Sequence, residues 1–473
     1  MSPAVEAAQT VAVVVTTIVI TTGLLQVIIQ LFQLSLTLAV LLRRPPAPRL
    51  GLVWGRYADV APPVAFLVPA YNEERSVVES INSLLAMHYP KVEVVVVNDG
   101  STDRTLSTLV KAFGLVAAAW EFNDVLPHKP IRTIFRSPRE PRLLVVDKEN
   151  GGKADALNCA VNMCRSPIVC SIDADSLLEP DSLLRAVKPF IDDPVRTIAI
   201  GATVRVANGC RIAHGRVLEV RLARNMLAVM QTVEYLRAFL MARVAWSQIG
   251  LLTIVSGAFG MFRRQIVIEV GGYSRETVGE DFELVVKMHR YMREHGREYR
   301  IEFVPEPVCW TEVPESWSSL GRQRSRWQRG AIETFFRHKR MLANPKYGRI
   351  GLLGYTNMLL VDLISPIAEV LGYLLLPTLW LLGLLSMEYL IVFLVISFSL
   401  GVTVSVGAFI LQEIELRPFE RTRELAILFL AAIAENFGYR QINNIWRLWG
   451  TWQYLRGDRA WGAMQRKGFE SPA

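Results

Sequence analysis

A long uncharged segment near the start of the chain limits its possible folds more than any other feature. No charged residue occurs between Glu6 and Arg43, a run of 36 residues. A helix needs about 20 residues to cross the hydrocarbon core of a bilayer, so the run predicts one long membrane helix, residues 1–44; two helices with a turn would barely fit. The run is also too long for the apolar core of a cleaved signal peptide, about 7–15 residues. We therefore expect a membrane protein.

A second apolar region predicts two further membrane helices, at about 355–382 and 389–411. Arginines follow the first and the third of these three helices: Arg43 and Arg44 after the first, and Arg417 after the third. Cytosolic loops carry an excess of Lys and Arg, so we expect the N-terminus outside and the long segment between the helices in the cytosol. The pattern predicts a multi-pass protein of the cell inner (plasma) membrane.

The stretch that follows the third helix allows two interpretations. Residues 425–434 are apolar but only ten long, a length typical of interfacial or re-entrant segments. Extended to a full span, the stretch would carry Glu435 and Arg440 through the membrane. We favour the polar span, and predict a C-terminal membrane region over 355–450 followed by a basic tail, 451–473, in the cytosol or at the interface.

Two acidic residues lie within the second predicted helix. Asp362 and Glu369 are seven residues apart and therefore face the same side of a helix, with Pro366, which should kink it, between them. Carboxylates inside a membrane are costly and usually line a cavity or pair with cations. We expect a water-filled translocation path; the alternative is a Glu near the interface that reaches toward water.

The charge balance narrows the class of ligand. The chain has 52 Lys and Arg against 44 Asp and Glu, and 51% of its 473 residues are hydrophobic. The excess of cations lies beside the apolar runs, which favours a membrane surface and anionic substrates over nucleic acid. No nucleic-acid partner is therefore expected.

Residues 64–340 show a different pattern, in which short apolar runs alternate with helical ones. The runs predict strands at 64–68, 92–97, 143–146, 168–172 and 197–204. The helical patterns between them lie at 75–87, 102–113, 154–164 and 181–190. Fully apolar strands separated by helices indicate a parallel sheet covered on both faces. Such doubly wound α/β domains bind ligands beyond the carboxyl ends of their strands.

Polar residues follow four of the predicted strands. The segments are Pro69–Glu74 (PAYNEE), Asn98–Asp103 (NDGSTD), Lys148–Asn158 (KENGGKADALN) and Asp173–Ser176 (DADS). Neither G-x-G-x-x-G nor G-x-x-x-x-G-K-[ST] occurs, so the dinucleotide-binding and P-loop fingerprints are absent. A nucleotide or other ligand expected at these strand ends must therefore be recognised by residues other than those of these two fingerprints.

Among these motifs, the D-x-D pair Asp173 and Asp175 has the most clearly defined chemical role. Two carboxylates at i and i+2 after a strand point to one side and can hold a hard cation. Mg²⁺ or Mn²⁺ held there would neutralise the diphosphate leaving group of a sugar nucleotide. Taken alone the motif is weak, because an aspartate that caps a helix explains it equally well.

Together with Gly279-Glu280-Asp281 and Gln323-Arg324-Ser325-Arg326-Trp327, the ordered loops resemble the processive family-2 glycosyltransferases, which include cellulose, chitin, hyaluronan and poly-N-acetylglucosamine synthases. The resemblance covers about residues 64–340. It implies a GT-A-type doubly wound mixed sheet over 60–312, on the cytosolic side, and an amphipathic interface helix over 313–345 that lies on the inner leaflet.

The resemblance also implies roles for individual residues on the donor side. Tyr71, Glu73 and Asp99 would surround the uracil and ribose of a UDP-sugar. Lys153 would lie near the nucleotide or diphosphate. Asp173 and Asp175 would hold ribose and metal, with Asp175 the main metal ligand.

On the acceptor side, Asp281 resembles the general base that takes a proton from the attacking hydroxyl. The alternative is that it supplies favourable charge at the start of a helix. With one base the reaction is a direct displacement that inverts an α-linked donor to a β product. Gln323, Arg326 and Trp327 share one helix face. Arg326 suits the diphosphate and Trp327 suits a sugar ring.

The expected function is therefore transfer from a UDP-sugar to a growing β-linked polysaccharide, with translocation of the product. The donor would be UDP-N-acetylglucosamine or UDP-glucose, since the Ser256–Gly260 loop departs from the cysteine-containing version of some relatives. One alternative is addition of a single sugar to a membrane lipid; another is a transporter whose soluble part only binds nucleotide. A further membrane subunit as partner is compatible with these expectations.

Overall fold

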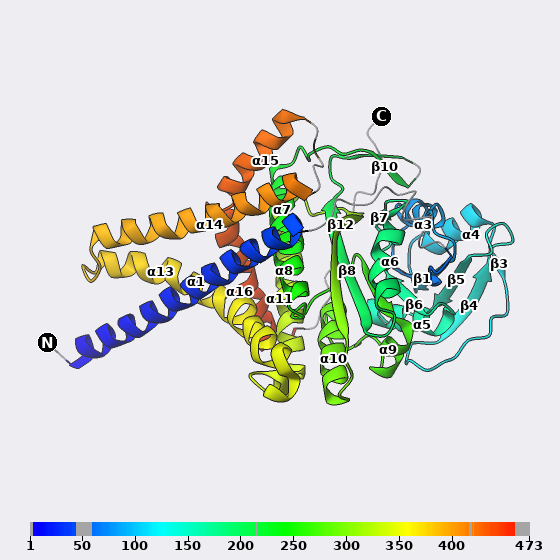
Figure 1. Ribbon diagram of the computed structural model, residues 1–473, viewed down its shortest axis with the longest axis horizontal. Helices are drawn as coiled ribbons and strands as arrows, with labels where there is room; N and C mark the ends of the chain where they lie inside the picture. Colours follow the sequence, from blue (N-terminus) through cyan, green and yellow to red (C-terminus); the bar gives the residue numbers. More distant parts are fainter. Residues whose placement is uncertain (1–2, 44–58, 214, 416–418, 420, 459–473) are drawn as a thin grey trace.

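The computed structural model describes residues 3–43, 59–213, 215–415, 419 and 421–458. Figure 1 shows two parts along its long axis: helices α1, α13 and α14 extend to the left, and a sheet covered by helices lies on the right. Between them stand α7 (Met226–Tyr235), α11 (Trp317–Arg337) and α16 (Tyr439–Leu455). The loops of the sheet therefore face the membrane helices across a layer of intermediate helices.

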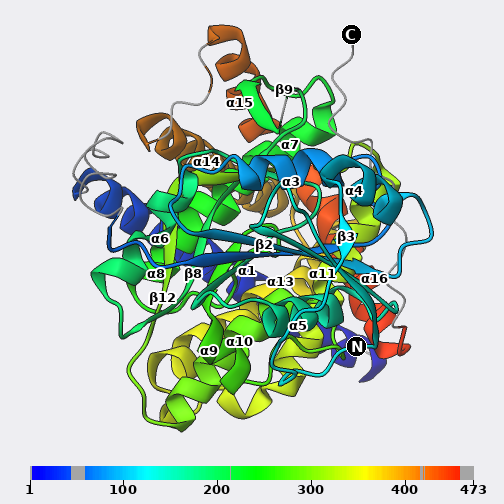
Figure 2. The same ribbon diagram turned by 90° about the vertical axis from the view of Figure 1, so that its right-hand side faces the viewer.

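The centre of the sheet is parallel, as the alternating pattern predicts. Its strands are β1 (Val64–Ala70), β2 (Val92–Asp99), β5 (Leu143–Lys148) and β6 (Ile168–Ser171), and β1 pairs in parallel with both β2 and β6. The valines of β2 are fully buried because helices cover both faces. In Figure 2, α3 (Val77–Leu85) lies on one face and α5 (Lys153–Met163) on the other.

The complete sheet is mixed, which confirms the fold that the resemblance implies and corrects the purely parallel expectation. The strand order is β3-β4-β5-β2-β1-β6-β11-β8-β12-β7. The antiparallel members include β4 (Ile131–Arg136) at one side and β11 (Gly260–Arg263), which lies between β6 and β8 (Thr197–Val206). β11 has only four residues and β4 carries polar side chains, so neither has the long apolar run by which the other strands are recognised.

The remaining sheet elements complete the domain. They are β3 (Val116–Ala117), β7 (Ser176–Leu178), β12 (Arg300–Thr311), and a separate hairpin of β9 (Arg211–Ala213) and β10 (Arg216–Glu219). Further covering helices are α4 (Thr105–Phe113), α6 (Ser182–Asp192), α9 (Arg264–Glu269) and α10 (Glu280–Glu294). α10 begins one residue before Asp281, so the predicted base lies in the first turn of a helix.

Within the part of the chain that the structure describes, three helices are long and apolar enough to cross a membrane, as predicted: Thr16–Arg43, Ile350–Leu381 and Met387–Ile414. The first belongs to the single helix α1 (Pro3–Arg43) and the third to α14 (Met387–Glu415). The second includes α13 (Ser365–Leu381), which packs along α1. These helices are the leftward-pointing group in Figure 1.

The continuous polar span that we favour after α14 is not formed. The chain makes α15 (Thr422–Ala434), breaks, and starts α16 at Tyr439 after Gly438, which has φ +101°. Glu435 lies in the break and is fully buried, where it accepts hydrogen bonds from Arg237 at 2.6 Å and Ser405 at 2.5 Å. The break therefore places Glu435 where donors from two distant segments reach it.

Pro366 is accommodated by a π-helical turn rather than by a simple break. The stretch η5 (Met358–Ile364) immediately precedes α13. A proline cannot donate to the carbonyl four residues earlier, which here belongs to Asp362. That carbonyl accepts instead from Gln328 Nε2 at 2.9 Å and Arg447 Nη2 at 2.7 Å. Because of the proline, the Asp362 carbonyl is free to accept these two hydrogen bonds, which connect the second membrane helix to α11 and α16.

The predicted interface helix exists as α11, but two of its arginines are not at a leaflet surface. Arg324 and Arg329 are 4% and 5% exposed. Arg324 pairs with Glu234, and Arg329 donates to the carbonyl oxygen of Asp458 at 2.8 Å. α11 packs closely against α16, so its positive charges are partly neutralised inside the protein. The placement of this helix on lipid stays a prediction.

Candidate active site

One cavity of about 2880 Å³ lies at the carboxyl ends of the central strands and continues toward the membrane helices. All of the side chains that the sequence singles out lie along its wall. They are Tyr71, Glu73, Asp99, Lys153, Asp173, Asp175, Asp281, Gln323, Arg326 and Trp327. They come from segments as far apart as β1 and α11, so the fold brings the donor-side and acceptor-side residues into a single cleft.

The loops after β1 and β2 are joined to one another by Asn72. This residue has φ +57°, a region that asparagine tolerates better than most residues. Its side-chain oxygen accepts from the backbone N–H of Thr102 at 2.8 Å. Next to it Tyr71 is half exposed to the cavity, and Glu73 accepts from Ser76 Oγ. The two loops therefore form one rigid edge of the cleft.

Asp99 is more deeply buried than a residue that only contacts a ligand needs to be. It is 3% exposed, and its two carboxylate oxygens accept from the backbone N–H groups of Gly151 and Gly152 at 3.0 and 2.7 Å. These glycines form the turn before α5, and Gly152 has φ +89°. Asp99 therefore holds the turn that places Lys153, a role that the sequence does not reveal.

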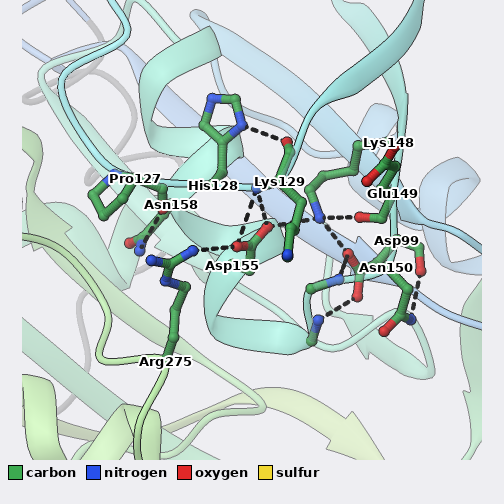
Figure 3. A network of polar contacts seen from close by, with 12 residues as sticks. Asp99, Pro127, His128, Lys129, Lys148, Glu149, Asn150, Asp155, Asn158 and Arg275 are labelled. Carbon is green, nitrogen blue, oxygen red and sulfur yellow. Dashed lines mark hydrogen bonds and ion pairs between the residues drawn. The ribbon is translucent and has the colours of Figure 1, made fainter.

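Figure 3 shows the buried polar network behind this turn. Lys148 is fully buried, and its Nζ lies 2.5 Å from Asp99 and 2.7 Å from Asp155. Asp155 also accepts from the backbone N–H of Lys129 and pairs with Arg275 at 3.1 Å. Burial alone would raise the pKa of Asp155, but these donors outweigh it and lower the pKa. The network links β2, β5, α5 and the segment that leads to α10.

Lys153 lies at the start of α5 and faces three carboxylates. Its Nζ is 2.6 Å from Asp173 Oδ1 and 3.4 Å from Glu280 Oε1. Burial alone would lower the pKa of Lys153, but the charges of Asp173, Glu280 and Asp281 outweigh it and raise the pKa. For Glu280, burial raises the pKa, and the positive charge of Lys153 opposes that rise. Lys153 is therefore a stable cation at the centre of the cleft.

Asp281 is half-buried, and its carboxylate lies against a glycine of the Ser256–Gly260 loop. A Cβ on Gly257 would come within 2.8 Å of Asp281 Oδ2 and 3.0 Å of Lys153 Nζ. A side chain at this position would force the ends of Asp281 and Lys153 to shift. Asp281 Oδ1 accepts from the backbone N–H of Phe282 at 2.8 Å. The loop, the predicted base and the cation thus converge at one point.

α11 is docked onto the segment before the predicted base. Gly279 and Gly330 pack backbone to backbone, so that a Cβ on Gly330 would meet Gly279 Cα at 2.9 Å. Glu333 accepts from Thr277 Oγ1 at 2.8 Å and from the backbone N–H of Val278 at 2.9 Å. These contacts fix α11 relative to Asp281 and place Gln323, Arg326 and Trp327 on the cavity wall.

Trp327 is 44% exposed and is oriented by a neighbour that the sequence analysis does not single out. The Arg324 guanidinium lies 4.3 Å from the centre of its ring. Arg324 pairs with Glu234 of α7 at 2.8 Å, and Glu234 also accepts from the hydroxyl of Tyr439 in α16 at 2.7 Å. Three helices therefore set the orientation of the indole plane.

The cavity wall on the membrane side is polar. It includes Gln26, Gln30 and Gln33 of α1, Asn357, Asp362 and Glu369 of the second membrane helix, and Arg440, Asn443, Asn444 and Arg447 of α16. Glu369 accepts from Asn444 Nδ2 at 2.6 Å, and Asp362 Oδ1 lies 3.8 Å from Arg447. The expectation that both carboxylates face one side and line a cavity is confirmed.

The D-x-D pair was tested for its fit to a divalent cation. Among the residues that the structure describes, no three His, Cys, Asp or Glu side chains are grouped to hold a metal ion. Mg²⁺ bound to a diphosphate, however, needs only one or two protein carboxylates, because phosphate oxygens and water complete the shell. Asp173 is engaged by Lys153, while Asp175 is 7% exposed on the cavity wall. The pair therefore fits a cation that arrives with a diphosphate.

A mixed α/β sheet with these loops at its strand ends, joined by one cavity to helices long and apolar enough to cross a membrane, is the arrangement expected of a glycosyltransferase. Residues 62–330, more than half of the chain, match the family described as "Glycosyltransferase like family 2". The protein belongs to this family, as the sequence motifs predict.

Two curated relatives with the name of a polysaccharide synthase are also similar to this chain. The chain is 28% identical over 275 residues to a protein of Staphylococcus aureus (strain COL) named poly-beta-1,6-N-acetyl-D-glucosamine synthase, a match that covers 58% of this chain and 56% of the relative. A Staphylococcus epidermidis protein of the same name is 27% identical over 297 residues, which cover 63% and 61%. The match thus spans little more than half the length of each relative.

A solved structure is similar over nearly the whole chain. It is the mannosyltransferase PcManGT from Pyrobaculum calidifontis, in complex with GDP-Man and Mn²⁺, with a TM-score of 0.56 and 20% sequence identity. The alignment covers 95% of this chain and 99% of that one. The likeness supports the fold: both chains have the same overall arrangement.

Proposed function

We propose that the protein transfers sugar units from a UDP-sugar to a growing β-linked polysaccharide and moves the product outward between its own helices. One observation carries the proposal: a single cavity joins the donor loops, Asp281, Trp327 and the polar wall of the membrane helices. A transferase that adds one sugar to a soluble acceptor and releases it needs no such continuation. A chain of hydroxyl groups needs a polar path of this kind, because it cannot cross hydrocarbon alone.

Donor binding follows from the residues of the strand-end loops. Tyr71 is positioned to stack on the base, and Glu73 lies on the same edge of the cleft as a partner for the nucleoside. Asp175, with Asp173, would hold Mg²⁺ or Mn²⁺, which when bound neutralises charge on the leaving diphosphate. Lys153 and Arg326 would supply further positive charge, and Gln323 would add a polar contact on the acceptor face.

Transfer itself requires a base, an attacking hydroxyl and a leaving group. In the proposed mechanism Asp281 accepts the proton as the acceptor oxygen bonds to the anomeric carbon and the bond to the UDP oxygen breaks. Attack from the opposite face inverts the α linkage to β. Trp327 would hold the sugar ring of the acceptor in line for this displacement, because an aromatic plane packs against C–H groups. Positioning of this kind lowers the entropic part of the barrier.

Two features favour N-acetylglucosamine over glucose as the transferred sugar. Both Staphylococcus relatives carry the name of an N-acetylglucosamine polymer synthase. The Ser256–Gly260 loop beside the base also lacks cysteine. UDP-N-acetylglucosamine is therefore the proposed donor, and UDP-glucose the second candidate.

The proposed placement in the cell extends the three candidate spans. The N-terminal helix, 1–44, and the region 355–450 are proposed to lie in the inner membrane, with the transferase domain, 60–312, in the cytosol. The helix region 313–345 is proposed to lie along the inner leaflet, and 451–473 to follow as a basic tail. A further membrane subunit is compatible with this arrangement.

The size of the product tests the proposal. Purified full-length protein in lipid nanodiscs is supplied with radiolabelled UDP-N-acetylglucosamine, and in parallel with UDP-glucose and UDP-glucuronate. We expect a high-molecular-mass polymer from one donor, degraded by a matching β-glycosidase. Lipid-linked mono- or disaccharide as the sole product would contradict processive synthesis and establish the single-addition alternative.

Removal of the divalent cation should stop turnover. EDTA is expected to lower sugar transfer at least about 100-fold, and added Mg²⁺ or Mn²⁺ to restore it, because a bound cation contributes several kcal/mol to charge stabilisation. Asp175→Asn should show a similar loss that added metal does not restore. Asp181→Asn, which alters an exposed pair with His88, is the matched control. Full activity of Asp175→Asn in EDTA would remove the metal from the mechanism.

A further inference from the structure

Arg243 occupies an unusual position on the wall of the active-site cavity. It is the last residue of the π-helical stretch η1 (Leu236–Arg243), which connects α7 to α8 (Val244–Gln248). π-Helical turns are rare and are frequent at functional sites. The side chain is 9% exposed, and its guanidinium lies 3.8 Å from the ring centre of Phe239 and 6.0 Å from that of Phe303. Two aromatic rings therefore hold it in place.

The guanidinium has no hydrogen-bond acceptor in the part of the chain that the structure describes. Its Nη1 is buried without a partner, and only the two rings contact its faces. Two other arginines of this wall differ, since Arg324 pairs with Glu234 and Arg237 with Glu435. A buried cation whose donors are unmatched is destabilising, so its presence indicates that a ligand supplies the acceptors.

Arg243 also keeps its charge. Burial lowers its pKa to about 10, and the negative charge of Asp281 acts in the opposite direction. It is therefore positively charged at neutral pH and close enough to the predicted base for their charges to interact. No carboxylate of the described chain lies within ion-pair distance of its guanidinium, so its donors stay available for a ligand in the cavity.

The neighbours of Arg243 place it on the acceptor side. The donor loops follow β1, β2 and β6, whereas η1 packs against the membrane helices α1 and α14. Thr37 of α1 donates to the carbonyl of Met241 at 2.7 Å. Trp246, one turn beyond Arg243, and Gln33 of α1 line the same cavity. A ligand beside η1 therefore lies next to the membrane helices.

We propose that Arg243 binds the acceptor glycan, with its guanidinium donating hydrogen bonds to hydroxyl or amide oxygens of a sugar unit near the one that Asp281 deprotonates. The inference rests on the proposed function and adds a named acceptor contact to it. A planar guanidinium suits two oxygens on one sugar, and the adjacent rings suit its C–H face. The acceptor is uncharged, so the positive charge of Arg243 remains to attract Asp281 in its ionised form.

The test separates acceptor binding from donor binding. Full-length protein in nanodiscs is titrated with β-linked N-acetylglucosamine trisaccharide and, separately, with β-linked glucose trisaccharide, and the half-saturating concentration for sugar transfer is measured. The inhibition constant of UDP is measured in parallel. For Arg243→Met we expect the half-saturating concentration of the effective trisaccharide to rise about tenfold, and the UDP constant to change less than twofold. Arg243→Lys keeps the positive charge and the aliphatic part of the side chain. Its half-saturating trisaccharide concentration should lie between those of the wild type and Arg243→Met.

Arg263→Met is the matched control. Arg263 is a half-buried arginine that lies 5.8 Å from the Phe190 ring and donates to the carbonyl of Thr197, away from the cavity. The Arg263→Met variant should leave the half-saturating trisaccharide concentration and the UDP inhibition constant unchanged. An unchanged trisaccharide constant in both Arg243 variants, or a parallel loss of UDP affinity, would overturn the assignment while the proposed function stands. If the wild-type protein forms polymer from the donor alone but elongates neither trisaccharide, the acceptor contact fails while the proposed function stands. If no polymer forms either, both fail.

Discussion

Asp281→Asn should lower sugar transfer by about 10²–10⁴-fold, the usual contribution of a general base. Asparagine keeps the size of the side chain and can still accept from the backbone N–H of Phe282, but it cannot take a proton. Because the UDP contacts are proposed for other side chains and asparagine preserves the shape of the site, the affinity for UDP should remain. The measurement is the initial rate of polymer formation together with UDP binding by calorimetry.

Two comparisons make this result specific. Glu276→Gln removes a carboxylate five residues earlier that is 75% exposed and pairs with Arg337, and it should leave the rate unchanged. Release of UDP from Asp281→Asn at the wild-type rate, in the presence of acceptor, would show that Asp281 is not the base. Such a result would also restore the alternative of a transporter with a nucleotide-binding domain.

Lys148→Met should destabilise the transferase domain by about 3–5 kcal/mol, the usual cost of removing one partner of a buried ion pair. The change leaves the carboxylates of Asp99 and Asp155 buried together without the cation between them. For a domain of this size the loss corresponds to a fall in Tm of at least about 6 °C. Thermal unfolding of the full chain, followed by tryptophan fluorescence, measures it.

Lys188→Met is the control for this variant. Lys188 pairs with Asp192 on an exposed helix face, where an ion pair contributes about 0.2–1 kcal/mol. The Tm of Lys188→Met should change by no more than about 4 °C. A similar Tm for both variants would mean that the network in Figure 3 does not stabilise the domain. Donor affinity provides a second readout, because Asp99 holds the turn before Lys153.

The candidate site could be predicted from the sequence wherever one local rule applied. Parallel strands end at the same edge of a sheet, so polar segments that follow apolar runs are expected to meet there. Tyr71, Asp99 and Asp173 follow β1, β2 and β6 and line the cavity as expected. The sequence positions of Asp173, Asp175 and Trp327 did not indicate how far apart these side chains lie in the folded protein. Their shared cleft was expected only from the family resemblance.

The residues that sequence reasoning missed depend on partners far along the chain. Lys148 was assigned only to the end of a strand, but its charge is matched by residues of β2 and α5. Glu234 lies in a segment without a motif, yet it orients Arg324 and, through it, Trp327. Gly330 follows the Q-x-x-R-W motif and reads as an ordinary helix residue until its contact with Gly279 is seen.

Two expectations about polar groups beside the apolar segments were incomplete for the same reason. Hydropathy describes how a segment would partition between water and lipid, and it treats each segment separately. It could not show that Glu435 finds Arg237 and Ser405 and thereby interrupts the predicted span. It also could not show that Arg324 and Arg329 are neutralised inside the protein rather than by lipid headgroups.

The amino-acid sequence by itself determined the three apolar helices, the α/β domain between them and the loops that carry the chemistry, because hydropathy, periodicity and strand-end motifs depend on near neighbours. Only the tertiary structure decided that the donor cleft opens toward the membrane helices, and that the carbonyl freed by Pro366 ties one of them to α11. Contacts of that kind join segments tens to hundreds of residues apart. They follow from how whole surfaces pack, which no local pattern contains.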